Sequence, residues 1–320
     1  MQTTRSNPLP AEHWTEEVVC PICSTALYKV LRPASYPSTL EPKQVLEIYR
    51  SSSDCVLLDQ LVQCLSCSLV YLNPRMKTEL ILNSYTNSLD SRFAAQDLAR
   101  IQTFKKNLKI IAPHLPAEEK NQNLILDIGC ASGAFLKAVS DFKLEGIGIE
   151  PNQWLVEFGR IHYGVDIRQG TLMDFKFDDS SFSAISLWDV LEHVCNPKDV
   201  LHECQRILKK EGILIINIPD YSSLARRLLR YKWPFFLNVH LYYFTPETIA
   251  HLLKQCGFQI FLTKPFWQIL ELGYILERAS HVFPAFRGIR KVISSLSLDP
   301  VPVTYTLGQT LILAKKINPL

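Results

Sequence analysis

The clearest chemistry near the start of the chain lies in four cysteines arranged as two C-x-x-C pairs. Cys20 and Cys23 form C-P-I-C, and Cys64 and Cys67 form C-L-S-C, on either side of a spacer rich in Ser and Pro. Each pair presents two thiolates from one tight turn, and two pairs complete the tetrahedral four-sulfur shell of a structural zinc site. We therefore predict zinc at these four residues, with redox-active pairs or ordinary core cysteines as alternatives. Cys55, within the spacer, is expected to be a spare thiol.

A second group of residues follows a short apolar run near the middle of the chain. The sequence D-I-G-C-A-S-G from Asp127 to Gly133 places Gly129, Cys130 and Ala131 where a strand would turn into a helix. Small residues let the backbone of such a turn approach a ligand. The spacing differs from the G-x-G-x-x-G of dinucleotide sites, and an acid at this strand end would repel a pyrophosphate. We predict a cofactor loop for a ligand that carries an ammonium group.

Four further residues stand where later strands of the same pattern would end. Glu150 ends the second strand, where it could accept hydrogen bonds from ribose hydroxyls. Thr171 and Leu172 follow the third strand, where an adenine could lie, and Asp189 follows the fourth. Ligands of open parallel sheets bind outside the carboxyl ends of the strands. We therefore predict that these four residues line one cleft with the cofactor loop.

These residues need a scaffold in which apolar strands alternate with helices. Strands are predicted at 124–128, 144–149, 166–170, 183–187, 213–218, 258–263 and 310–314. Helical patterns begin at 133 and 152 and span 198–208 and 246–255. Such alternation builds a mainly parallel sheet covered by helices. The predicted fold class is α/β: a Rossmann-like, mainly parallel seven-stranded sheet with an N-terminal zinc ribbon and a helical C-terminal insertion before the last strand.

The other segments flank or interrupt this sheet. We predict a zinc ribbon over residues 1–75, a helical linker over 76–115 and the main domain over 116–320. Within the main domain, the aromatic and Arg-rich segment 219–245 follows the last main parallel strand. A loop at that place lies over the carboxyl ends of the strands, so this segment is expected to cover a substrate pocket.

A helical insertion is predicted at 267–297, where apolar residues recur three or four apart. Pro284 should break it into two helices. Basic residues lie among its apolar positions, namely Arg278, Arg287, Arg290 and Lys291. This insertion is expected to pack on the body of the protein or a second copy of the chain, or to contact a membrane surface.

Four of these segments resemble successive motifs of class I S-adenosylmethionine-dependent methyltransferases: LILDIGCASGAFL, GIGIEP, FSAISLWDVLEHV and GILIINIPD. CPIC, QCLSCSLVYLNPR and HLYYFTPETIAHLLKQCGF are similar to a branch with an N-terminal zinc ribbon, which includes methyltransferases of sugars and other small metabolites. The resemblance implies S-adenosylmethionine as cofactor. The residues predicted to bind it are Asp127, Gly129, Cys130, Ala131, Gly133, Glu150, Thr171, Leu172 and Asp189. Ala131 stands where the family often has Gly.

The predicted catalytic residue is His240, in the segment NVHLYYFT. Histidine is a suitable general base near neutral pH. In the sugar carbon-methyltransferases that this segment resembles, the matching histidine belongs to a Glu-His pair, whereas Val239 precedes it here. A loop-stabilising or substrate-binding role is the alternative. His193 offers another possibility, because Asp189, Glu192 and His193 could bind a divalent cation, as a similar arrangement does in quinone-type oxygen methyltransferases.

Composition narrows the class of protein. With 320 residues, 47% hydrophobic residues and a formal charge of +3, the chain is globular and lacks the basic excess of a dedicated nucleic-acid binder. The first twenty residues do not resemble a signal peptide and no membrane span is predicted, so a cytoplasmic location is expected. The leading function is methyl transfer to a sugar, nucleotide sugar or lipid-linked intermediate. An RNA methyltransferase and a non-catalytic scaffold are the alternatives.

Overall fold

The computed structural model describes residues 14–36, 44, 48, 57–81, 91–116 and 123–317. Cys55 lies outside these residues, as do parts of the predicted ribbon and linker. Within the described residues, no helix combines the length and apolar character needed to cross a bilayer.

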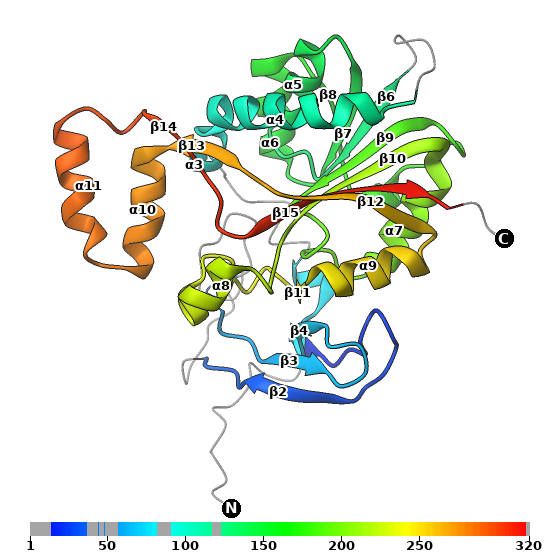
Figure 1. Cartoon of the computed structure of the whole chain (residues 1–320), viewed down its shortest axis with the longest axis horizontal. Helices are drawn as coiled ribbons and strands as arrows, with labels where there is room; N and C mark the ends of the chain where they lie inside the picture. Colours follow the sequence, from blue (N-terminus) through cyan, green and yellow to red (C-terminus); the bar gives the residue numbers. More distant parts are fainter. Residues whose placement is uncertain are drawn as a thin grey trace, which may run out of the picture.

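A seven-stranded sheet crosses the centre of the molecule in the order β12-β15-β10-β9-β6-β7-β8 (Figure 1). Neighbouring strands from β10 to β8 run parallel, and β15 is antiparallel to both of its neighbours. The strands are β6 (Leu124–Ile128), β7 (Glu145–Glu150), β8 (Asp166–Gln169), β9 (Phe182–Trp188), β10 (Leu208–Pro219), β12 (Phe258–Pro265) and β15 (Gln309–Lys316). The predicted mainly parallel α/β sheet is confirmed.

Helices cover both faces of this sheet because its central strands are apolar on both sides. In β10, Ile213 and Ile215 pack with α4 and α5, whereas Leu214 and Ile216 pack with α7 and α9. This double burial explains the continuous apolar sequence of the strand. The helices are α4 (Asp97–Ile111), α5 (Ala134–Asp141), α6 (Gln153–Tyr163), α7 (Pro197–Ile207) and α9 (Pro246–Gln255).

A smaller antiparallel sheet holds the N-terminal cysteines and also recruits a strand from the covering segment. Its order is β11-β4-β3-β2, formed by β2 (Tyr28–Arg32), β3 (Leu61–Cys64), β4 (Val70–Leu72) and β11 (Tyr242–Tyr243). A separate pair joins β1 (Thr15–Glu16) to β5 (Arg75–Met76). The Arg75 guanidinium donates to the Tyr242 hydroxyl at 2.9 Å and to the Cys195 carbonyl at 2.9 Å. The N-terminal region is therefore attached directly to the segment predicted to cover the pocket.

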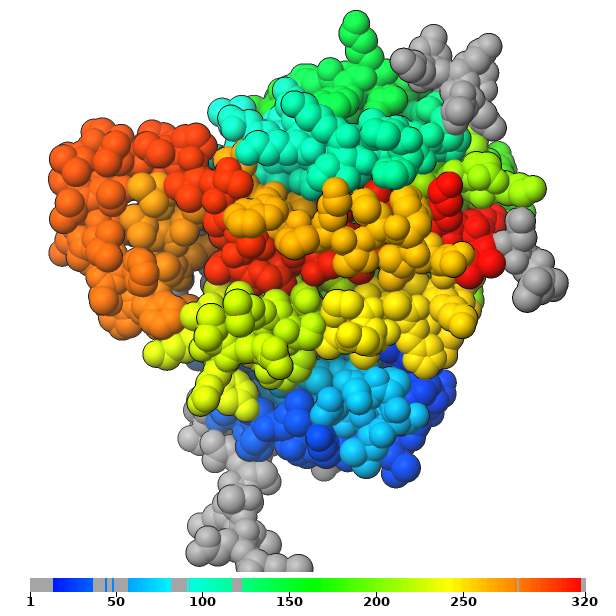
Figure 2. Space-filling model, in the orientation of Figure 1, coloured from blue at the N-terminus to red at the C-terminus, as the bar shows by residue number. Residues whose placement is uncertain are grey.

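A helical hairpin made of α10 (Leu272–Val282) and α11 (Phe286–Ser295) projects from the body of the molecule (Figures 1 and 2). The predicted break at Pro284 is confirmed. The predicted helical start at residue 267 is wrong, because Gln268–Glu271 forms β13, which pairs with β14 (Pro302–Tyr305). The Ile269 N–H donates to the Thr103 hydroxyl of α4 at 2.6 Å. These tertiary bonds outweigh the helical spacing of the sequence.

Short elements complete the chain. They are α3 (Ser91–Ala94), α8 (Leu224–Leu229) and three 3₁₀ turns at Ala112–His114, Leu172–Asp174 and Arg230–Lys232.

Candidate active site

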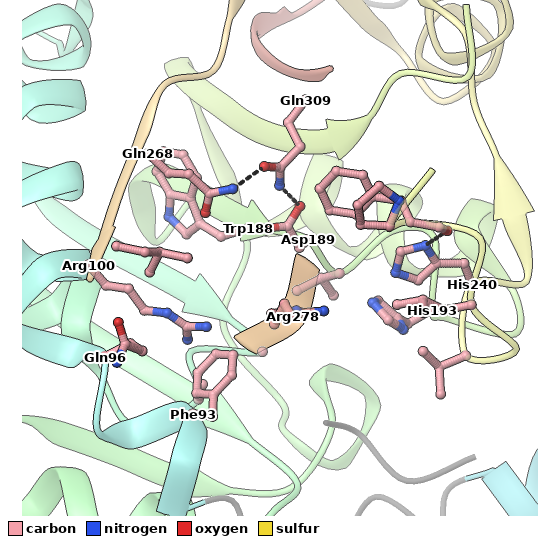
Figure 3. A pocket seen from close by; sticks show the side chains of 18 of the residues that line it. Phe93, Gln96, Arg100, Trp188, Asp189, His193, His240, Gln268, Arg278 and Gln309 are labelled. Carbon is pink, nitrogen blue, oxygen red and sulfur yellow. Dashed lines mark hydrogen bonds between the residues drawn. The ribbon is translucent and has the colours of Figure 1, made fainter. Parts of the chain in front are cut away.

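A cavity of about 1970 Å³ lies at the carboxyl ends of β6, β7 and β9. Residues of the segment 231–240 and of the α10–α11 hairpin also line it, and Figure 3 shows His240 and Arg278 from these two parts. Typical small-molecule sites measure roughly 300–1000 Å³. The cavity therefore has room for a cofactor and a second ligand side by side.

The loop between β6 and α5 forms one wall and is held close to β7. The N–H groups of Gly129 and Cys130 both donate to the Ile149 carbonyl, at 2.8 and 3.1 Å. Gly129 has φ +66°, and a Cβ atom there would lie 2.7 Å from Val190 Cγ2. Ala131 also adopts positive φ, at +48°. The tight turn and close approach predicted for this loop are present.

Glu150 ties this loop to the start of α6. Its carboxylate is buried, accepting from the Ala131 N–H at 3.0 Å through Oε2 and from the Asn152 N–H at 2.9 Å through Oε1. Each carboxylate oxygen has a second lone pair. Glu150 also lines the cavity, so the two oxygens can serve the loop and a ligand together.

Asp127 lies at the end of β6, almost completely buried, and accepts from the Ser186 hydroxyl at 2.7 Å. Burial raises its pKa to about 8, the nearby Glu150 carboxylate adds to the rise, and the Ser186 hydrogen bond opposes it. A buried carboxyl with this pKa gains most from a cationic ligand, which would favour its ionised form. That property matches the ammonium group predicted for the ligand.

Asp189 occupies the end of β9 in a left-handed conformation, with φ +54°. Its Oδ1 accepts from Asn217 Nδ2 at 2.8 Å and from Gln309 Nε2 at 2.7 Å, and Gln309 in turn accepts from Gln268 at 2.8 Å (Figure 3). Asp189 faces the cavity, but the surrounding protein limits its solvation and raises its pKa to about 6. The amide network orients this carboxyl across the cavity from Arg100.

The third strand end contributes a wall in which the side chain of Thr171 bonds locally. The Thr171 N–H and hydroxyl both donate to Asp174 Oδ2, at 2.7 and 2.8 Å, and Leu172 is buried beside them. Both residues line the cavity. Leu172 therefore supplies apolar surface to a ligand. The N–H and hydroxyl of Thr171 are already bonded to Asp174.

Two predicted cofactor residues are placed differently from the rest. Gly133 is absent from the cavity wall; it begins α5 with φ +80°, and a Cβ atom there would lie within 2.9 Å of Val165 and Ile167. The side chain of Cys130 packs among Leu136 and neighbouring core residues. Gly133 thus permits helix packing, and Cys130 offers the ligand only its backbone.

The predicted catalytic histidine lies in a buried cluster with two residues of another segment. His240 Nδ1 bonds to the Phe235 carbonyl at 2.8 Å, and its ring lies 4.6 Å from that of His193 at an interplanar angle of 85°. One ligand atom from each of Glu192, His193 and His240 lies within 4.8 Å of the others. Burial lowers the pKa of His193 to about 4 and that of His240 well below its usual range. Both imidazoles are therefore neutral at physiological pH.

With this geometry described, the chain can be compared with known proteins. A model of the methyltransferase domain matches residues 98–262, just over half of the chain. The chain belongs to the methyltransferase domain family. The matched span begins at α4 and ends in β12, so it includes every predicted cofactor residue and His240.

Individual relatives agree with this assignment. The domain is 25% identical over 137 residues, 42% of this chain, to a Mycolicibacterium smegmatis protein named "Probable S-adenosylmethionine-dependent methyltransferase". It is 28% identical over 117 residues, 33% of this chain, to the ubiquinone biosynthesis O-methyltransferase of Actinobacillus pleuropneumoniae. The matches span about half the length of these relatives, 52% and 48%.

Solved structures share the fold. One is a chain from the complex of the Haloferax volcanii Trm112 methyltransferase activator with its methyltransferase. That chain superposes with a TM-score of 0.50 at 16% identity, covering 72% of this chain and 96% of its own length.

The tertiary structure also brings side chains to the cavity that the sequence did not predict, most of them from outside the matched span. Gln96 directly precedes α4 and Arg100 lies within it, whereas Gln268 comes from β13, Arg278 from α10 and Gln309 from β15 (Figure 3). They lie far apart in the sequence and carry no motif. Arg278 was noted only as a basic residue among apolar positions. Its place beside the cavity depends on how the hairpin packs.

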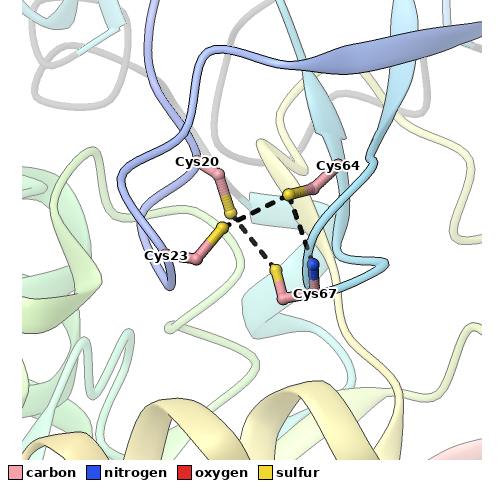
Figure 4. A group of neighbouring side chains, drawn as sticks. All are labelled: Cys20, Cys23, Cys64 and Cys67. Atoms are coloured by element: carbon pink, nitrogen blue, oxygen red, sulfur yellow. Dashed lines mark hydrogen bonds between the residues drawn. The ribbon is translucent and has the colours of Figure 1, made fainter.

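The four N-terminal cysteines converge as predicted (Figure 4). The Sγ atoms lie 3.4 Å apart in two pairs, Cys20 with Cys67 and Cys23 with Cys64. All four Sγ atoms lie within 4.8 Å of one another. Sulfur atoms bound to one tetrahedral zinc lie about 3.8 Å apart. The N–H groups of Ser66 and Cys67 point at Cys64 Sγ, at 3.4 and 3.5 Å. This arrangement fits a closed metal site.

Proposed function

We propose that the protein transfers a methyl group from S-adenosylmethionine to a small-molecule acceptor. The observation that carries this proposal is the continuity of one cavity. It runs from the strand ends, where Glu150 and Asp127 lie, into a second chamber under residues 231–240 and the α10–α11 hairpin. A methyltransferase must chiefly align an acceptor with an already activated methyl group.

The strand-end part of the cavity suits the cofactor. Glu150 has lone pairs for the ribose hydroxyls, Leu172 offers apolar surface to the adenine, and the buried carboxyl of Asp127 favours the ammonium group. Asp189 also lines the cavity. When bound, the cofactor supplies the methyl group on a positively charged sulfonium.

The second chamber supports an acceptor that is amphipathic and anionic. Its walls are largely aromatic and apolar, with Phe93, Trp233, Phe235, Tyr274, Phe283 and Phe286 among them. Two guanidinium groups, those of Arg100 and Arg278, also line it. Burial lowers the pKa of Arg100, and the charge of Arg278 lowers it further. A phosphate between these two cations would relieve that repulsion. These features favour a nucleotide sugar or a lipid-phosphate-linked sugar.

His240 is the residue that we propose prepares the acceptor for transfer. Its bond from Nδ1 to the Phe235 carbonyl fixes the neutral tautomer and leaves Nε2 with a lone pair. Val239, which replaces the Glu of the related Glu-His pair, contributes no ionisable group, whereas Glu192 comes close from another segment. A carboxyl near His240 therefore comes from a different place in the chain, without a hydrogen bond between the two side chains.

We also propose that the cysteine cluster binds structural zinc. Cys20 and Cys64 are buried and Cys23 and Cys67 are partly buried, so no coordination position faces the large cavity. Lys198 of α7 donates to the Ile22 carbonyl at 3.1 Å. Zinc would therefore rigidify the turn that attaches the N-terminal region to the main sheet.

A lipid-linked acceptor would also give the hairpin a purpose, and we propose that α11 rests on an anionic membrane surface. Ile289, Val292 and Leu296 are 48%, 57% and 62% exposed. Residues 284–298 contain three basic residues and no acidic one. Exposed apolar side chains among basic residues are typical of helices that lie in the lipid interface. The hairpin also lines the second chamber, so a lipid-linked substrate would have a short path to it.

Vesicle sedimentation tests the membrane proposal. Binding is expected to phosphatidylcholine vesicles that contain phosphatidylglycerol and to weaken in high salt. Ile289→Glu should abolish it, whereas Leu98→Glu, at an exposed apolar position of α4, should not. Equal binding by wild type and Ile289→Glu would refute the proposed contact.

The enzymatic proposal is tested with purified protein and labelled S-adenosylmethionine. Calorimetry should show cofactor binding, and a screen of nucleotide sugars and lipid-linked sugars should label one class, with the methyl position read by mass spectrometry. An Arg278→Gln variant should keep cofactor binding and raise the KM of an anionic acceptor. Absence of cofactor binding would overturn the assignment.

A further inference from the structure

Glu192, His193 and His240 form a cluster that the cofactor site does not use. Glu192 and His193 follow β9, and His240 comes from the covering segment almost fifty positions later in the chain. Backbone bonds hold the two segments together, since the Glu192 carbonyl accepts from the N–H groups of Leu241 at 2.8 Å and Tyr242 at 3.3 Å. The cluster is thus built by tertiary structure.

The Glu192 carboxyl is the most unusual member of the cluster. The residue is 1% exposed, and neither carboxylate oxygen has a hydrogen-bond partner in the described part of the chain. An unpartnered buried carboxyl costs several kcal/mol unless it is protonated or meets a cation. Both oxygens therefore favour a positively charged ligand.

The two imidazoles are arranged as metal ligands usually are. His240 bonds through Nδ1 to the Phe235 carbonyl, and the His193 ring bonds to the backbone of Val239. Metal-binding histidines commonly use one ring nitrogen for such a carbonyl and the other for the ion. The His240 ring is therefore oriented through Nδ1 and can present Nε2 to an ion.

We infer that Glu192, His193 and His240 bind one divalent transition-metal ion at the edge of the acceptor chamber. Ligand atoms around a tetrahedral ion lie about 3.4 Å apart. The three atoms here lie within 4.8 Å of one another, so small side-chain rotations would bring them together. Two nitrogens and one carboxylate suit Zn²⁺, Fe²⁺, Co²⁺ or Mn²⁺.

This ligand set differs from the acid-x-x-Glu-His set considered from the sequence. That set used Asp189, but Asn217 and Gln309 hold its Oδ1, and it is not part of the cluster. His240 takes the third position. Asp189 still contributes favourable negative charge from nearby, and Arg278 opposes it with positive charge.

An ion with three protein ligands keeps open positions for substrate. His193 and His240 line the cavity, so an acceptor oxygen could reach the ion. A bound cation lowers the pKa of a coordinated hydroxyl as it does that of water. In this respect the inference deepens the proposed function and rests on it: with an ion bound, Nε2 of His240 is a ligand, and activation of the acceptor passes from the imidazole to the ion. Ion binding itself requires no methyl transfer.

Titration with Mn²⁺, followed by electron paramagnetic resonance, tests the inference on the full chain with its cysteine cluster occupied by zinc. Mn²⁺ prefers oxygen and nitrogen ligands and will not replace zinc among four thiolates. One Mn²⁺ per chain is expected. Glu192→Gln and His240→Asn should each weaken binding at least tenfold with thermal unfolding little changed. Asp189→Asn is the matched control and should stay within about threefold of wild type.

The outcomes separate this inference from the proposed function. If neither Mn²⁺ nor Co²⁺ binds outside the cysteine cluster, or if Asp189→Asn loses as much affinity as Glu192→Gln, the assigned site is wrong. Calorimetry with S-adenosylmethionine on the same protein checks the proposed function alone. Binding of S-adenosylmethionine without binding of Mn²⁺ rejects only the ion site. Binding of Mn²⁺ without binding of S-adenosylmethionine rejects only the proposed methyl transfer.

Discussion

Replacing Glu150 by Ala tests whether one carboxylate both shapes the cofactor loop and binds the cofactor ribose. The variant leaves the N–H groups of Ala131 and Asn152, now 3.0 and 2.9 Å from the carboxylate, without their acceptor. Ala131 also loses the bond that holds it at φ +48°. We therefore expect weaker cofactor binding together with a lower unfolding temperature.

The magnitude follows from the hydrogen bonds. Bonds to a charged group contribute about 1.5–3 kcal/mol each. Loss of ribose recognition alone should raise the Kd for S-adenosylhomocysteine by about 10- to 150-fold. The two backbone N–H groups left without an acceptor should lower the free energy of unfolding by about 1–3 kcal/mol. The loss stays in this range because water can reach both groups through the cavity. Glu150→Gln, which keeps one acceptor oxygen, should fall between Ala and wild type.

Calorimetry with two ligands separates ribose recognition from loop damage. The first ligand is S-adenosylhomocysteine and the second is its 2′-deoxy analogue. In the wild type, removal of the hydroxyl should cost at least about tenfold in affinity, whereas in Glu150→Ala it should cost almost nothing. If both proteins lose the same affinity on removal of the hydroxyl, Glu150 does not bind the ribose and the reasoning fails.

Three further predictions concern other parts of the molecule. Metal analysis should find one zinc per chain in the wild type and in the control Cys256→Ser, but none in Cys64→Ser. Zinc in both variants would exclude the site. Asp127→Asn should increase the free energy of unfolding, measured in urea at pH 7, by about 2–4 kcal/mol, because the variant has no carboxyl to ionise in the protein interior. A folded-state pKa of about 8 makes the native protein lose stability as pH rises from about 4 to 8, so an equal gain at pH 4 would contradict this. His240→Ala should keep cofactor affinity but lower turnover about 10²- to 10⁴-fold; unchanged turnover would make His240 structural.

Local sequence was sufficient to predict the central scaffold. The strands predicted between 124 and 218 are apolar and separated by helical patterns, and the last residue of each lies within two positions of the prediction, although β10 begins at Leu208, five residues before its predicted start. The cofactor loop could be predicted for the same reason, since Gly129 meets a local backbone requirement at a strand-to-helix turn. Gly133 shows the limit of this reasoning. Its conformation serves contact with Val165 and Ile167, which no local pattern reveals.

Helical spacing was misleading where tertiary bonds decide conformation. Residues 268–271 have the spacing of a helix, but pairing with β14 and the hydrogen bond from Ile269 to Thr103 keep them extended. The acceptor chamber depends on the same packing. Arg100 and Arg278 line one cavity only because α4 and α10 both pack against β13.

The sequence by itself determined the parallel sheet, the cofactor loop and the two cysteine pairs, because each depends on residues close together in the chain. Tertiary structure alone decided which side chains share a site across long separations. It joined β11 to β4, which attaches the cysteine cluster to the pocket cover. It also placed His240 beside Glu192 and His193 while Asn217 and Gln309 held Asp189 apart. Such contacts arise from packing between distant elements, and no local spacing encodes them.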